Sequence, residues 1–205
     1  MPADYFYITS SKTEPWNPHP PIAVGDIIET VDVNPFFNFF LSANLRTERV
    51  NNGGVTENWS WMRFLGAIRD GSMKTSMSTQ DVAARGHYLA MHFCKYTREL
   101  IWESVRLANY KEKPSRQKCL WLTQGEQNLE YWKSKIVNDQ NLRQVFRVEI
   151  DGTTHEASDE HLMNDNLPYQ QALDMSHRYW RGEISNPIAR EILFEGKMRI
   201  IEQVE

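Results

Sequence analysis

A helical pattern of apolar residues between Ser78 and Tyr110 constrains the fold of this chain more than any other segment. Ser78 or Thr79 can cap the start of such a helix, and Asp81 lies in its first turn, where the helix dipole favours a negative charge. Apolar residues then recur at intervals of three, four or seven positions, which predicts one buried stripe. The stripe consists of Leu89, Phe93, Tyr96, Leu100 and Leu107.

Three charged residues of the same predicted helix lie near one another. Glu99, Glu103 and Arg106 are spaced by three and four positions, so they share one helical face. We expect this face to be solvated and its charges to form surface salt bridges.

Shorter strand and helix patterns surround the long helix. The segment 4–11 is rich in aromatic and β-branched residues and 144–150 alternates polar with apolar residues, so both are predicted strands. Asp151-Gly152 is predicted to be a turn, and Glu195-Gly196 the tip of a final hairpin within 189–204. The remaining predictions are a short strand or turn at 22–30, a short helix after Pro35, a strand at 118–123 and helices at 126–136 and 168–183. This order predicts a single α+β domain over residues 1–205.

Residues 44–75 show little periodicity and contain the loop sequence NNGG at 51–54. We expect a mobile, loop-rich region here, and a second loop in the proline-rich segment 12–21. Trp59, Trp61 and Arg63 make the region around 51–75 a candidate contact for an acceptor or a protein partner, with a tryptophan pair packed in the core as the alternative.

Charge and cysteine usage narrow the class of protein. The formal net charge of −4 argues against a general electrostatic grip on nucleic acid and leaves room for a local basic groove. Cys94 and Cys119 lie in apolar segments without a C-x-x-C spacing, so we expect a reducing, cytoplasmic location. The N-terminus lacks a secretory pattern, no apolar run is long enough for a membrane span, and the histidine spacing predicts no metal site.

Polar residues at the ends of the predicted strands and helices are the candidates for a binding site. They occupy the first strand, the entrance of the 118–123 strand, the end of the last helix and the start of the final hairpin. The candidates are Tyr7, Thr9, Ser115, Arg116, Tyr179, Trp180 and Glu191. Taken singly, each also fits an ordinary structural role, such as a turn residue or an edge-strand charge.

The order of five short motifs resembles a pattern found in small bacterial proteins of the ADP-ribosyltransferase superfold. The motifs are YFYIT at 5–9, ESVR at 103–106, PSRQKCLWL at 114–122, YWRG at 179–182 and EILFEG at 191–196. Each motif is short, and the ordered series, which spans nearly the whole chain apart from 36–75, carries the resemblance.

The resemblance implies a split β-sandwich with a helical, loop-rich insert between its first and middle strands. It implies that NAD binds as a substrate in a cleft between two short sheets. Tyr7 and Thr9 would contact the nicotinamide half, and Ser115 and Arg116 would support the nicotinamide ring. Arg116 could instead grip the pyrophosphate, because its planar fork suits that geometry.

The resemblance also implies a catalytic pair formed by Glu191 and Tyr7. Glu191 would stabilise positive charge on the ribose as nicotinamide leaves. Glu195 alternates onto the same face, and either could be the acid, although the motif places Glu191 there. Tyr179 and Trp180 would complete the cofactor-binding residues.

One departure from the pattern concerns Tyr7, which stands where the pattern has a histidine. A tyrosine hydroxyl can hydrogen-bond a ribose or an amide, but its proton chemistry differs. The favoured function is an NAD-dependent mono-ADP-ribosyltransferase, or NAD glycohydrolase, acting on an unidentified protein, nucleic-acid or small-molecule acceptor and not on a membrane. The alternatives are a catalytically silent nucleotide- or protein-binding module on the same fold, and an unrelated α+β protein.

Overall fold

The computed structural model of the protein describes residues 4–13, 19–42 and 46–205. The parts of the predicted loops at 12–21 and 44–75 that fall on residues 14–18, 44 and 45 lie outside the described residues. Within the described part of the chain, no helix combines the length and the apolar character that crossing a membrane requires.

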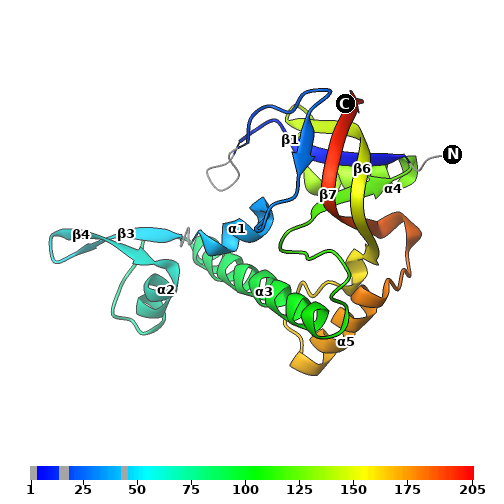
Figure 1. Cartoon of the computed structure of the whole chain (residues 1–205). Coiled ribbons are helices and arrows are strands. Elements are labelled where there is room, and N and C mark those ends of the chain that lie inside the picture. Colours follow the sequence, from blue (N-terminus) through cyan, green and yellow to red (C-terminus); the bar gives the residue numbers. More distant parts are fainter. Residues whose placement is uncertain (1–3, 14–18, 43–45) are drawn as a thin grey trace.

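A five-stranded antiparallel sheet and a set of helices form a mixed α+β structure, as predicted (Figure 1). The order of the strands is β2-β7-β5-β1-β6, and β6 also pairs with β7, so the pairings β7–β5–β1–β6 close into a ring. The strands are β1 Tyr5–Ser10, β2 Ile27–Glu29, β5 Leu120–Gln124, β6 Arg143–Ser158 and β7 Arg190–Gln203.

The edge of β7 that does not face β6 is shared between two other strands. Residues 192–194 of β7 pair with β5, whereas residues 197–199 pair with β2. Because β5 and β2 pair with successive stretches of the same edge, the sheet divides there. This division positions the cavity described below.

The predicted turn at Asp151-Gly152 and the predicted hairpin tip at Glu195-Gly196 are both wrong. The two glycines face each other in the middle of a continuous β6–β7 ribbon. A β-carbon added to Gly196 would lie 2.2 Å from the carbonyl oxygen of Asp151, and one added to Gly152 would lie 2.1 Å from that of Glu195. Glycine is therefore required by the close approach of the two backbones, a cause that the sequence does not distinguish from a turn.

The helices begin and end mostly where local signals predict. The side chain of Ser78 caps the long helix α3 by accepting from the Asp81 amide, and Gly182 ends α5 in a left-handed conformation with φ of 73°. The helices are α1 Pro35–Leu41, α2 Trp61–Arg69, α3 Thr79–Asn109, α4 Glu126–Ile136 and α5 Tyr169–Arg181, with short 3-10 turns at Asp159–His161 and Pro187–Ala189.

The predicted buried stripe of α3 is wrong in part. Phe93, Leu100 and Leu107 are 45–49% exposed, whereas Trp102 and Val105 are buried. The buried face of α3 also carries charged residues, so the hydrophobic period does not identify it. Tertiary ion pairs make this face suitable for burial.

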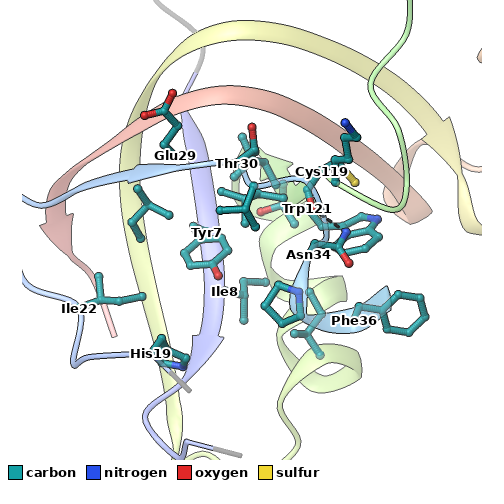
Figure 2. Close-up of a pocket in the computed structure, with 18 of the residues that line it drawn as sticks. Tyr7, Ile8, His19, Ile22, Glu29, Thr30, Asn34, Phe36, Cys119 and Trp121 are labelled. Atoms are coloured by element: carbon teal, nitrogen blue, oxygen red, sulfur yellow. Dashed lines mark hydrogen bonds between the residues drawn. The ribbon is translucent and has the colours of Figure 1, made fainter. Parts of the chain in front are cut away.

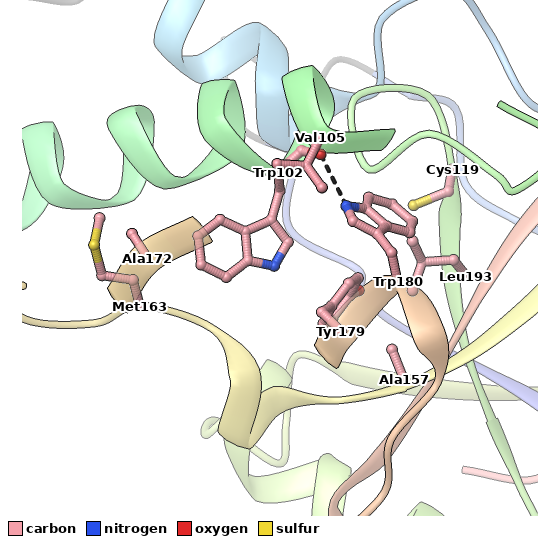
Figure 3. Packing of buried hydrophobic residues seen from close by; sticks show 9 residues of the cluster. All are labelled: Trp102, Val105, Cys119, Ala157, Met163, Ala172, Tyr179, Trp180 and Leu193. Carbon is pink, nitrogen blue, oxygen red and sulfur yellow. Dashed lines mark hydrogen bonds between the residues drawn. The ribbon is translucent and has the colours of Figure 1, made fainter. Parts of the chain in front are cut away.

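A core cluster joins α3 to α5 and to the ribbon (Figure 3). Trp102 and Trp180 are fully buried in it, and the indole Nε1 of Trp180 donates to the backbone oxygen of Trp102 at 2.8 Å. The bond satisfies a polar group that burial would otherwise leave unpaired. The cluster thus fixes the C-terminal end of α5, which carries Tyr179, against α3.

The expected loop-rich region around 44–75 contains regular structure instead. Strand β3 Thr47–Asn52 pairs with β4 Val55–Ser60, and α2 follows directly. Gly53 and Gly54 both have positive φ, so these two residues of the NNGG sequence form the two-residue turn of a hairpin, and its asparagines belong to β3. The hairpin and α2 form an arm that projects beyond the N-terminal end of α3 (Figure 1).

Candidate active site

A cavity of about 910 Å³ is lined by β5 and β2, the two strands that pair with successive stretches of β7. Its walls come from β1, β2, the segment before α1, β5 and α4. This volume is within the range of small-molecule and cofactor sites. The division of the sheet therefore produces a cavity of the size that a ligand would need.

Aromatic side chains form much of the cavity wall. Tyr7 comes from β1, Phe36 from the start of α1, Trp121 from β5 and Trp132 from α4. Figure 2 shows Tyr7 among the lining side chains, with Trp121 and Asn34 grouped to one side of it. Burial raises the pKa of the Tyr7 phenol, so Tyr7 remains a neutral hydrogen-bonding group. Such a wall suits a planar ring system.

Charged side chains line one part of the cavity. Arg116, from the turn before β5, is 3% exposed, and Glu191, at the start of β7, is 6% exposed. The Nη1 of Arg116 donates to Glu191 Oε1 at 2.8 Å and also to the hydroxyl of Tyr179, which itself donates to Glu191 Oε1. Three side chains that are distant in sequence therefore meet at one carboxylate oxygen.

Glu99 of α3 holds the opposite side of Arg116. Its Oε2 accepts from Arg116 Nε at 2.9 Å and its Oε1 from Arg116 Nη2 at 3.3 Å, while Arg98 Nε donates to Oε1 at 3.0 Å. Glu99 is fully buried. The group thus contains two guanidinium and two carboxylate groups, whose charges balance when all four are ionised.

Mutual attraction keeps Glu99 and Arg116 ionised although both are buried. Burial alone would raise the pKa of Glu99, but Arg116 and Arg98 hold it below its usual range. Burial would lower the pKa of Arg116, but Glu99, Tyr179 and Glu191 raise it well above its usual range. Burial raises the pKa of Tyr179 well above its usual value, so its hydroxyl stays protonated and able to donate.

Glu191 retains one uncommitted oxygen. Its Oε1 accepts both bonds, whereas its Oε2 accepts none from the residues that the structure describes. Because Glu191 lines the cavity and its other oxygen is fixed by Arg116 and Tyr179, the carboxylate is held in place with Oε2 left for a ligand. A fixed carboxylate in a water-poor site can stabilise a developing positive charge.

The network engages most of the donors of Arg116. Nε and one N–H of Nη2 donate to Glu99, and both N–H groups of Nη1 are used by Tyr179 and Glu191. One of the five N–H donors is left. This arrangement indicates that Arg116 orients Glu191 and does not bind a pyrophosphate.

Ser115 belongs to a neighbouring cluster and does not line the cavity. Its hydroxyl donates to Glu103 Oε2 at 2.8 Å, and its backbone N–H donates to Glu195. Glu103 in turn forms an ion pair with Arg106 at 2.7 Å. The prediction that this face of α3 is solvated is therefore wrong. Glu99 and Arg106 are buried by partners from the turn after the helix.

Two further predicted residues do not reach the cavity. Trp180 packs in the core between α3 and the ribbon, and Thr9 of β1 does not line the cavity. Of the seven predicted residues, Tyr7, Arg116 and Glu191 line the cavity and Tyr179 supports it from behind, whereas Thr9, Ser115 and Trp180 do not line it. Glu195, the alternative acid, lies outside the cavity on a small surface pocket.

A neutral histidine supports the end of α5. His155 of β6 accepts at Nδ1 from Lys113 Nζ at 3.2 Å and donates from Nε2 to the backbone oxygen of Tyr179 at 3.0 Å. Burial lowers the pKa of His155 to about 4, so the imidazole is neutral at pH 7. The neutral imidazole can therefore accept from Lys113 at Nδ1 and donate to the Tyr179 backbone oxygen from Nε2.

Sequence reasoning missed two residues that build the site. Asn34 caps α1 and donates from Nδ2 to the backbone oxygens of Arg116 and Cys119 at 2.8 and 3.0 Å, which ties the turn before β5 to the cavity wall. An asparagine before Pro35 is a recognisable cap signal. No comparable signal marks Glu99, because a buried glutamate is indistinguishable in sequence from a surface one.

Comparison with protein families gives one match over this whole structure. The family model described as "Protein of unknown function (DUF2441)" matches residues 5–205. The matched region contains every residue of the cavity network. No curated protein matches the chain.

Proposed function

We propose that this chain, which belongs to the DUF2441 family, cleaves the bond between nicotinamide and ribose in NAD and transfers the ADP-ribose to an acceptor or to water. One observation carries the proposal. Tyr7, Arg116 and Glu191, singled out by the motif order, come from three distant parts of the chain and line one cavity. The divided sheet around this cavity supports the proposed ADP-ribosyltransferase-like split β-sandwich.

The chemistry assigns a role to Glu191. As the glycosidic bond breaks, its electron pair leaves with nicotinamide and positive charge develops on the ribose carbon. The carboxylate of Glu191, held by Arg116 and Tyr179, stabilises that charge through its free Oε2. The acceptor nucleophile then bonds to the ribose carbon and releases its proton.

The aromatic wall supports the binding of the two ring systems of NAD. Tyr7 and Trp121 lie on neighbouring strands of the ring of pairings and both line the cavity. Aromatic faces bind planar rings by stacking, and the neutral phenol of Tyr7 adds a hydrogen-bonding group. Trp121 and Tyr7 are therefore the proposed contacts for nicotinamide or adenine.

Release of nicotinamide from NAD tests the proposal. The purified protein is incubated with NAD beside the variants Glu191→Gln and Glu195→Gln. Glu195 lies four residues further along β7 and outside the cavity, so it is the matched control. We expect release by the wild type and by Glu195→Gln and its loss in Glu191→Gln. Release that persists in Glu191→Gln contradicts the assignment of the acid.

A second candidate is a silent module that binds a nucleotide without turnover. Tyr7 in place of the histidine of the pattern favours it, since the raised pKa of the buried phenol makes proton transfer at neutral pH difficult. A ligand present at a hundred times its Kd stabilises the folded state by about 2.7 kcal/mol. A raised melting temperature with NAD and no nicotinamide release would select this candidate, and the absence of both effects would contradict both.

A further inference from the structure

The arm formed by residues 46–77 takes no part in the proposed NAD site. It consists of the β3–β4 hairpin, α2 and the connection to α3, and it projects from the body as a separate unit (Figure 1). Val50 and Phe64 form its small core between the hairpin and α2. A projection of this kind presents a two-stranded ribbon to the solvent.

The two faces of this ribbon differ in chemistry. The pairing register places Val50, Glu48, Glu57 and Trp59 on the inner face, toward α2 and the start of α3. The outer face contains only side chains with amide, hydroxyl or guanidinium groups, and no carboxylate. These residues are Thr47, Arg49, Asn51, Thr56, Asn58 and Ser60. All but Ser60 are exposed.

The acidic residues of the arm are neutralised by arginines. Glu48 pairs with Arg85 of α3 at 2.9 Å, and Glu57 accepts from the indole of Trp59 at 2.7 Å and lies 3.6 Å from Arg63. Because these partners are on the inner side, the positive charge of the outer face is not cancelled locally.

The arm is positive although the chain is negative. Residues 46–77 carry five basic and three acidic side chains, whereas the formal net charge of the whole chain is −4. Arg49 is exposed at the centre of the outer face and has no carboxylate partner among the described residues. Arg46 stacks on Tyr88 at 4.1 Å, and Arg63 on Trp59 at 3.7 Å, so both exposed guanidinium groups are held in place.

We propose that this arm binds double-helical DNA, with the β3–β4 ribbon lying in the major groove. A two-stranded ribbon fits the major groove of B-form DNA, and arginine, asparagine, serine and threonine are the side chains that bond base edges and phosphates. The deep, narrow major groove of an RNA duplex excludes such a ribbon. An acidic protein partner would account for the positive charge of the arm, but it would not account for an outer face of amides and hydroxyls around Arg49. The inference is independent of NAD cleavage.

Fluorescence anisotropy of a labelled DNA duplex titrated with the full chain at about 50 mM salt tests the inference. We expect micromolar binding that weakens as salt increases. Arg49→Glu should weaken it about tenfold or more. The matched control is Arg199→Glu, which makes the same charge change at an exposed arginine of β7, outside the arm, and should leave the affinity nearly unchanged.

Several outcomes would overturn the inference. These are absence of binding at low salt, equal weakening by Arg199→Glu, and equal or tighter binding of an RNA duplex or of single-stranded DNA. Displacement of the DNA by polyglutamate at equal charge concentration would indicate an acidic protein as the partner instead. Both substitutions are at exposed sites, so the melting temperatures of the variants should match that of the wild type and exclude unfolding as the cause.

Discussion

The buried charges behind the cavity make Glu99 the residue on which the stability of the site most depends. Glu99→Gln preserves the shape of the side chain and removes its charge. Arg98 and Arg116, 5% and 3% exposed, then lose the carboxylate that lies 2.9 Å from each of them. Removing one partner from a buried ion pair costs about 3–5 kcal/mol, because an uncompensated charge stays in the interior.

Urea unfolding followed by circular dichroism measures this loss. A decrease of about 3–5 kcal/mol in the free energy of unfolding corresponds to a melting temperature lower by about 6–20 °C in a chain of this size. Glu202→Gln is the matched control, because Glu202 pairs with Arg147 at 2.6 Å on the surface, where such pairs contribute about 0–1 kcal/mol. A loss for Glu99→Gln no larger than that of the control would refute the reasoning that the network is desolvated.

Three further predictions concern the ribbon, the neutral histidine and the core. Gly196→Ala should destabilise the protein by at least about 2 kcal/mol in thermal unfolding, because the new β-carbon would meet the backbone of the opposite strand; a neutral effect would contradict the close approach. The pKa of His155 is about 4 in the folded state and 6.5 in the unfolded state, so the unfolded state binds more protons between these values. Stability should therefore fall by up to ~3 kcal/mol as the pH is lowered from 6.5 to 4, and His155→Gln should flatten that part of the profile. Trp180→Phe should cost about 1–3 kcal/mol in urea unfolding, because it removes the buried hydrogen bond from the indole to the Trp102 carbonyl and leaves space in the core; a cost below that of an exposed-site control would contradict this role.

Local signals predicted elements that depend only on neighbouring residues. Ser78 and Asp81 mark the start of α3, and the glycine after Arg181 marks the end of α5, because capping bonds form within one turn of chain. The alternation at 144–150 identified part of β6 for the same reason. The α+β class follows from the order of these elements.

Predictions failed where one local pattern has two physical causes. Gly152 and Gly196 have the sequence appearance of turns, but they face each other within a continuous ribbon. The NNGG sequence at 51–54 has the appearance of a loop, but Gly53-Gly54 is the turn of a hairpin whose strands extend on both sides. In each case the partner strand determines which backbone geometry forms, and that strand is either distant in sequence or has a weak sequence pattern.

The candidate site could likewise be predicted only in part from the sequence. Motif order singled out Tyr7, Arg116 and Glu191, and the structure places all three on one cavity. The burial of Glu99 and the commitment of Arg116 to two carboxylates could not be read in advance, because a charged residue enters the interior only when opposite charges from other elements meet it there. Residue types and caps are properties of the chain itself, whereas the environment of a charge is a property of the elements that fold around it.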